Sequence, residues 1–138
     1  MNARKRNQPK NEQHKGLSTR GKRAKLIKAK LMPLAKSGTK VYNKSIQENV
    51  YITAKGIKET AHHASRTMPS TMAALDARMQ LRTARKTFTT TAGHSKQQRD
   101  MKLVELVVMK GTKNGRKTKV TVGKKASGKH LLYCITSK

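Results

Sequence analysis

Residues 55–66, KGIKETAHHASR, constrain this chain more than any other stretch, because their apolar and polar positions repeat with the period of a helix. Ile57, Ala61 and Ala64 fall on one face, which predicts a helix that packs its back against a core. The polar positions form two stripes: Lys55, Glu59 and His63 in one, and Lys55, Lys58, His62 and Arg66 in the other. Cations that hold a phosphate, together with groups that move protons, suit chemistry on a phosphodiester.

The charge of the chain narrows its partners. Lysine and arginine number 33 against 6 acids, a formal net charge of +27 in 138 residues. Self-repulsion of this size opposes compaction and is relieved by an anionic partner, so nucleic acid is the expected ligand. The sequence contains no apolar run of about 18 residues and no signal peptide near its start, so we expect no membrane partner.

The residue types present argue against a metal or cofactor site. The single cysteine, Cys134, rules out an internal disulfide and a cysteine-based zinc site, and its apolar surroundings, LLYCI, predict a small core residue. Five histidines without clustered acids make a poor metal site, so we expect neither metal nor cofactor. Only 3 tyrosines and 1 phenylalanine are present, which weakens any interpretation based on aromatic platforms that stack bases.

A change in composition near residue 40 divides the chain. Residues 1–39 are basic and polar, which predicts a largely disordered arm or linker containing a short helix over 24–34 that ends near Pro33. Residues 40–138 are expected to form one domain. It begins with two short strands at 40–43 and 49–53, and the amphipathic helix follows from about Ala54.

A second helix is predicted over 71–86, with Ser70 as its N-cap. Its apolar stripe is Met72, Leu75 and Met79, and its basic stripe is Arg78, Arg82 and Arg85. Residues 87–100 are polar and contain a glycine, so we expect a loop. Strands at 101–110, 117–123 and 130–136 follow, the middle one with Val120 and Val122 inward. The expected fold is α+β, with two helices packed on a small antiparallel sheet that ends in a three-strand meander.

RNA suits a basic site without a metal, because its 2′-OH is an internal nucleophile. Cleavage by transesterification needs a base for that hydroxyl, an acid for the leaving 5′ oxygen, and cations for the phosphorane charge. His63 is the candidate base or acid, Glu59 its partner, and Tyr133 a proton donor. Lys55 and Lys58 are the candidate catalytic cations, and the expected substrate contacts are His62, Arg66, Arg78, Arg82, Arg85, Lys119 and Thr121.

Each of these residues also has a plain structural explanation. Glu59 and His63 can belong to a solvated helix face, Tyr133 can be a half-buried sheet aromatic, and Thr121 can be an exposed strand threonine. Spacing alone does not separate His62 from His63.

Three pieces together resemble a known family: KGIKETAHHA (55–64), STMAAL (70–75), and KVTVG (119–123) with LLYCIT (131–136). Their order and spacing are similar to the nuclease-like domains of the barnase–EndoU–colicin–RelE class, found in large polyvalent phage and mobile-element proteins and in polymorphic toxins. The resemblance covers about residues 40–138. By position, it assigns the helix histidine to His63, the lysines to Lys55 and Lys58, and the strand residues to Thr121 and Tyr133.

The resemblance implies an α+β fold and a metal-independent ribonuclease toxin that cleaves cellular RNA, either tRNA or mRNA. It further implies an immunity protein or antitoxin as partner. We expect that partner to be acidic, the free chain to be a monomer, and its action to take place in the bacterial cytoplasm after delivery as the C-terminal part of a secreted effector. Two alternatives stay open. One is a non-catalytic RNA- or DNA-binding protein of the ribosome or chromosome, and the other is a structural module that keeps the nuclease fold without its activity.

Overall fold

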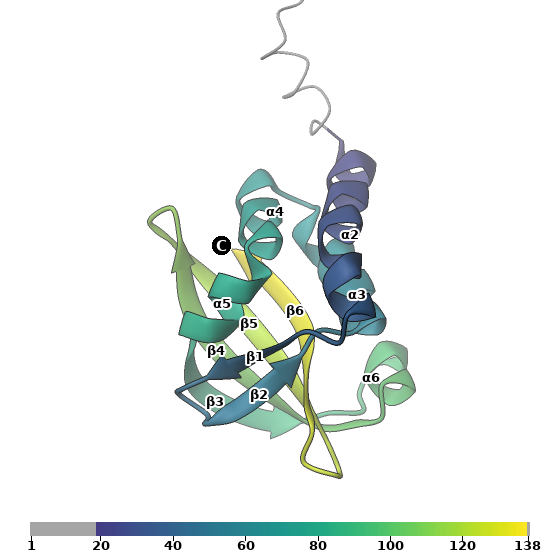
Figure 1. Cartoon of the computed structure of the whole chain (residues 1–138), viewed down its shortest axis with the longest axis vertical. Coiled ribbons are helices and arrows are strands. Elements are labelled where there is room, and N and C mark those ends of the chain that lie inside the picture. The colour runs from purple at the N-terminus through teal and green to yellow at the C-terminus, as the bar shows by residue number, and fades with distance from the viewer. Residues whose placement is uncertain (1–18, 138) are drawn as a thin grey trace, which may run out of the picture.

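The computed structural model describes residues 19–137 and shows an α+β fold built on one six-stranded mixed sheet (Figure 1). The strands are β1 (Lys40–Asn43), β2 (Glu48–Tyr51), β3 (Arg85–Thr91), β4 (Leu103–Lys113), β5 (Arg116–Lys125) and β6 (His130–Ser137). The helices are α2 (Arg20–Lys36), α3 (Ala54–Ala64), α4 (Met68–Leu75), α5 (Ala77–Thr83) and α6 (Lys96–Asp100). The strand order across the sheet is β1-β2-β6-β5-β4-β3.

The predicted meander is confirmed, because β4, β5 and β6 pair in sequence as antiparallel neighbours. The two predicted short strands correspond to β1 and β2, which pair in the antiparallel sense. The sheet as a whole is nevertheless mixed, since β2 runs parallel to β6 over two residue pairs, Val50 with His130 and Tyr51 with Leu131. This parallel join follows from the chain path: α3, α4 and α5 intervene before the meander, so β2 does not lead directly into it.

Helix α2 corrects the extent of the predicted arm. The helix expected over 24–34 runs from Arg20 to Lys36, with Thr19 as its N-cap and Pro33 in its last turn. Ile27 and Leu31 are fully buried in the main core, so residues 20–36 pack with the domain. Their spacing of four residues presents one apolar stripe to that core. Residues 1–18 of the expected arm lie outside the described residues.

The second predicted helix is wrong in its start and its continuity. The helix begins at Met68 with Thr67 as N-cap, and Asp76 separates it into α4 and α5. Ser70 lies inside α4, where its hydroxyl donates to the carbonyl of Ser137 at 2.9 Å. The predicted methionine stripe is largely exposed. The buried positions of α4 and α5 are instead Ser70, Thr71, Ala73, Ala74, Ala77, Gln80 and Leu81.

The predicted loop over 87–100 is also corrected, because its first five residues belong to strand β3 and its last five form α6. The run of threonines carried the missed signal, since β-branched residues favour strands even where no apolar alternation marks them. Every residue of β3 is exposed, which is why the alternation is absent.

The two faces of the meander have different roles. Val107, Val122 and Leu132 align across β4, β5 and β6 and are buried in the main core under α2–α5. The predicted inward positions Val120 and Val122 are confirmed as fully buried. The opposite face holds a smaller cluster of Met101, Leu103, Leu131 and Tyr133 near α6. Figure 1 shows α6 below α3 and to the side of the strands.

Candidate active site in a cleft between α3 and the sheet

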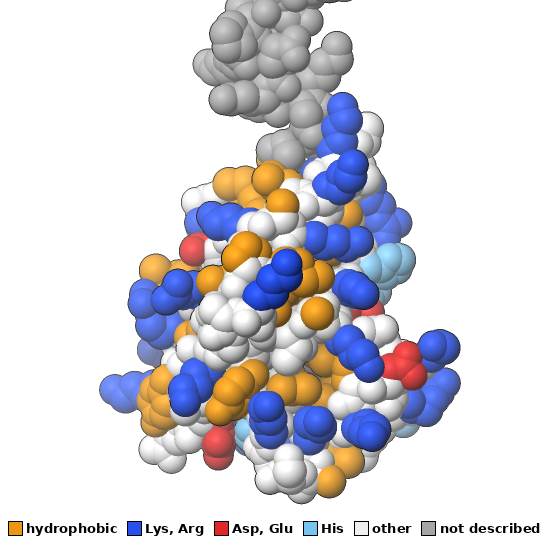
Figure 2. Space-filling view, turned by 45° about the vertical axis from the view of Figure 1, so that its right-hand side comes forward, with side chains coloured by type: hydrophobic (Ala, Val, Ile, Leu, Met, Phe, Trp, Pro, Cys, Tyr) orange, Lys and Arg blue, Asp and Glu red, His pale blue; other side chains and the backbone are white. Residues whose placement is uncertain are grey.

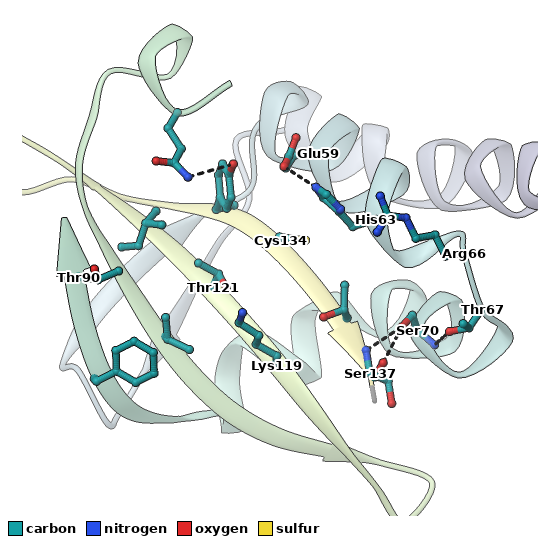
Figure 3. Close-up of a pocket in the computed structure, with 16 residues that line it drawn as sticks. Glu59, His63, Arg66, Thr67, Ser70, Thr90, Lys119, Thr121, Cys134 and Ser137 are labelled. Carbon is teal, nitrogen blue, oxygen red and sulfur yellow. Dashed lines mark hydrogen bonds and ion pairs between the residues drawn. The ribbon is translucent and has the colours of Figure 1, made fainter. Parts of the chain in front are cut away.

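A cleft of about 630 Å³ opens between α3 and the face of the sheet that is turned away from the main core (Figure 3). One wall is formed by α3 and the turn after it, through Glu59, His63, Arg66 and Thr67. The opposite wall is formed by β3 and β4, through Phe88, Thr90, Leu106 and Val108. Residues of β5 and β6 lie between the walls as a floor: Lys119, Thr121, Tyr133, Cys134, Thr136 and Ser137.

The position of α3 depends on its contact with an open strand edge. Beyond Leu131, β6 has no strand partner on its β2 side, and α3 packs along that edge. The approach is close because Gly56 has no side chain: a Cβ there would lie 2.0 Å from the carbonyl oxygen of Leu132. Thr60, fully buried, also donates its hydroxyl to the Tyr133 carbonyl at 3.5 Å. The helix therefore presents its apolar back to the core and its polar side to the cleft.

Glu59 and His63 form a direct pair on the polar side of α3. Nε2 of His63 lies 2.8 Å from Oε2 of Glu59, at the i, i+4 spacing expected from the sequence. The Glu59 side chain is 14% exposed and that of His63 is 34% exposed, so the carboxylate is shielded while the imidazole reaches the cleft. A shielded carboxylate that binds one ring nitrogen holds the imidazole in one tautomer and orientation.

A β-bulge directs Tyr133 into the same cleft. Thr121 pairs with Cys134 and Val122 pairs with Leu132, so Tyr133 is an extra residue in β6. Leu132 therefore faces the core while Tyr133 and Cys134 both line the cleft, where strict alternation would separate them. Gln98 of α6 donates to the Tyr133 hydroxyl at 3.5 Å. Burial raises the pKa of the phenol above its ordinary value, against the lowering effect of hydrogen bonds from Ser95 and Gln98.

Two cations and a hydroxyl complete the part of the cleft that faces His63. Arg66 and Lys119 are exposed and form no ion pair with any residue of 19–137. Thr121 lies on the face opposite the core, as expected, but it is buried rather than exposed because the cleft walls enclose it. Figure 3 shows Lys119 and Thr121 on the strand between His63 and Thr90. The cleft thus combines a carboxylate, an imidazole, a phenol and two cations.

Several expected site residues lie elsewhere. Lys55 donates to the backbone carbonyl of Asp100, on the α6 side of the helix. Lys58 and His62 line a separate depression between α2 and α3 together with Arg20 and Lys28. The basic stripe Arg78, Arg82 and Arg85 is exposed and does not line the cleft. Helix α3 has two polar sides, and β6 packs against the helix surface that lies between them. Only the side with Glu59 and His63 therefore faces the cleft, and the side with Lys58 and His62 faces α2.

The site also contains residues that sequence reasoning missed. Phe88, Thr90 and Gln98 fell in the predicted loop, and Leu106 and Val108 were assigned to a strand without a role. The alternation of β4 was a usable signal, since Leu106 and Val108 share the face opposite the core residues Val107 and Met109.

Cys134 lines the cleft without the properties of a nucleophile. Burial raises the pKa of its thiol to about 12, and the nearby Glu59 carboxylate adds to the increase. The thiol is therefore protonated at neutral pH, and the thiolate is the reactive form. Within residues 19–137, no three His, Cys, Asp or Glu side chains are grouped so that they could hold a metal ion.

Comparisons with known proteins identify no relative: no protein-family model, curated protein or solved structure matches this chain. None of the helices in the described part of the chain is long and apolar enough to cross a membrane.

Proposed function

We propose that this chain is a metal-independent ribonuclease that cleaves RNA by attack of its own 2′-OH on the adjacent phosphate. The observation that carries the proposal is the Glu59–His63 pair, which shares one cleft with a buried phenol and two exposed cations. The resemblance of residues 40–138 to nuclease-like toxin domains points to the same chemistry. The surface charge supports a polyanionic substrate, since Lys and Arg are spread widely over the face in Figure 2 with few acids among them.

His63 acts as the base in this proposal. Its Nε2–H donates a hydrogen bond to the Glu59 carboxylate, which leaves Nδ1 as the acceptor for the proton of the 2′-OH. The 2′ oxygen then attacks phosphorus and forms a bond to it, while the bond from phosphorus to the 5′ oxygen breaks. The imidazolium produced is stabilised by the Glu59 carboxylate, in the manner of other carboxylate–histidine pairs.

Tyr133 acts as the acid. The phenol is protonated at neutral pH, since burial raises a pKa that already lies well above that pH, and it can transfer its proton to the departing 5′ oxygen. Arg66 and Lys119 stabilise the charge of the phosphorane, and the Thr121 hydroxyl can donate to the same oxygens. The products are a 2′,3′-cyclic phosphate and a free 5′-OH. DNA is not a substrate because it lacks the 2′-OH.

The proposed biological role is that of a toxin domain, and the proposed partner is an acidic immunity protein or antitoxin. A net charge of +27 favours an acidic partner and its rapid capture by electrostatic steering. Expression of the wild-type chain in bacteria without a partner is therefore expected to arrest growth, and expression of His63→Ala is expected to be tolerated.

Total cellular RNA incubated with the purified protein in excess EDTA tests the proposal. We expect fragments that end in 2′,3′-cyclic phosphate, and a loss of about 10²- to 10⁴-fold in rate for His63→Ala, the usual contribution of a positioned base. His62→Ala is the matched control, because its ring lies 4.9 Å from that of His63 but faces the depression beside α2. Glu59→Gln is expected to reduce the rate by a smaller factor, since the amide can still bind Nε2.

The alternative functions make different predictions in the same assay. RNA that stays intact but is bound by the protein supports the non-catalytic binding protein and contradicts the ribonuclease. Equal cleavage by wild type and His63→Ala contradicts the assigned site, and a larger loss for His62→Ala than for His63→Ala transfers the catalytic role to His62.

A further inference from the structure

The two long walls of the cleft differ in chemistry. The α3 wall is polar and charged, with Glu59, His63 and Arg66. The β3–β4 wall presents the side chains of Phe88, Leu106 and Val108. A site for phosphate alone needs only the first wall. A nucleotide, by contrast, has a charged phosphate at one end and a flat, weakly polar base at the other.

Phe88 is an unusual residue for its position. It is the single phenylalanine of the chain, and it is 54% exposed on the edge strand β3. Burial therefore does not account for it, because an aromatic ring on a solvated edge strand contributes little to the core. The strand register places Phe88 opposite Val108, and Val108 opposite Thr121, so the three side chains form one row across the cleft.

The row has the length that a nucleotide requires. Neighbouring strands lie about 4.8 Å apart, so the β3 and β5 ends of this row are separated by about 10 Å. Thr121 and the cation Lys119 lie at the β5 end of the row, and Phe88 lies at the β3 end. A phosphate held near Lys119 and Arg66 thus leaves room for its ribose and base over Val108 and the Phe88 ring.

We infer that the β3–β4 wall is a subsite for an unpaired nucleobase, which stacks on Phe88 beside the scissile phosphate. The inference rests on the proposed function and specifies its substrate class as single-stranded RNA. A base inside a duplex already stacks on its neighbours on both sides and has no free face for Phe88, whereas a splayed base does. Stacking accepts every base, so this contact selects unpaired RNA without selecting sequence.

Binding of a short 2′-fluoro RNA, followed by fluorescence anisotropy, tests this subsite without cleavage, because that RNA has no 2′ nucleophile. We expect Phe88→Ala to bind the single strand roughly tenfold more weakly than wild type, and Phe88→Trp to restore binding. Tyr42→Ala is the matched control. Tyr42 is 53% exposed, close to the value for Phe88, but lies on β1 at the opposite edge of the sheet and does not line the cleft.

Two further measurements separate stacking from electrostatics. The slope of log affinity against log salt is expected to be the same for Phe88→Ala and wild type, since phenylalanine contacts no phosphate, and to decrease for Lys119→Gln. A 2′-fluoro duplex is expected to bind wild type and Phe88→Ala equally.

Unchanged single-strand binding by Phe88→Ala overturns the inference, and so does an equal loss for single strand and duplex. These outcomes are independent of the proposed function, which fails when ordinary RNA remains intact in the EDTA assay. The experiments can therefore reject the base subsite while RNA cleavage is still observed. They can also show base stacking on Phe88 in a protein that does not cleave RNA.

Discussion

Gly56→Ala is expected to destabilise the protein although it replaces a helix glycine with the best helix former. In an ordinary helix, this change stabilises by up to about 1 kcal/mol. At Gly56, however, the added Cβ would lie 2.0 Å from the carbonyl oxygen of Leu132 and 3.0 Å from its carbon. These are backbone atoms of β6, so no side-chain rotation can relieve the overlap.

The size of the effect follows from the displacement that is needed. Ordinary contact begins at 3.4 Å, so α3 and β6 must separate by about 1.4 Å at this point. Forced overpacking of this kind costs about 1–3 kcal/mol, and more where backbone must move. After the helix-propensity gain, we expect a net loss of about 1–2 kcal/mol in the free energy of unfolding. For a chain of this length, that lowers Tm by roughly 4–8 °C.

Gly21→Ala is the matched control for this experiment. Gly21 also lies in the first turn of a helix, α2, and a Cβ there would meet no atom of residues 19–137 within 4 Å. Urea denaturation followed by far-UV circular dichroism should show Gly21→Ala equal to or more stable than wild type, and Gly56→Ala less stable. Equal or greater stability for Gly56→Ala would refute the tight α3–β6 contact. Because α3 carries Glu59 and His63, the RNA cleavage proposed for this site should also be slower in this variant, since a shift of about 1 Å can reduce a rate by roughly 10²-fold.

Two other predictions concern a fully buried amide and a partly buried thiol. Asn43 is fully buried, donates to the carbonyls of Leu81 and Ala84 at 2.7 and 2.8 Å, and accepts from the Ile46 amide at 3.0 Å. Asn43→Ala should therefore cost at least about 3 kcal/mol in urea denaturation, and a cost below about 1 kcal/mol would contradict this network. Burial raises the pKa of the Cys134 thiol from 9.0 to about 12, so its contribution to stability is complete below pH 9 and is lost as pH rises towards 12. Folded protein should therefore react slowly with iodoacetamide at pH 7.5, and rapid alkylation would contradict the shielding of the Cys134 thiol. Between pH 9 and 12, the Cys134→Ala variant should lose less stability than wild type.

Much of the fold could be predicted from local patterns. The α3 helix has a strong period of 3.6 residues and a threonine N-cap, and the meander has alternating valines with an Asn-Gly turn between β4 and β5. The failures have physical reasons as well. Strand β3 is wholly exposed and carries no alternation, so its segment was assigned to a loop. The helix α2 was predicted over 24–34, but the basic composition around it placed it in the arm rather than in the domain. Asp76 separates α4 from α5 where the apolar spacing suggested continuity.

The sequence showed which chemical groups were available for a site, but it did not show which of them face the same cleft. Residue order alone determined an amphipathic helix with Glu59 and His63 one turn apart, a basic chain, and an α+β arrangement of elements. The tertiary structure decided which polar stripe of α3 faces the sheet, because Gly56 lets the helix pack against the open edge of β6. It also turned Tyr133 into the cleft, opposite Glu59 and His63, through a bulge in β6, and it placed Phe88 opposite the charged wall. Such contacts join residues distant in the chain, and local periodicity carries no information about them.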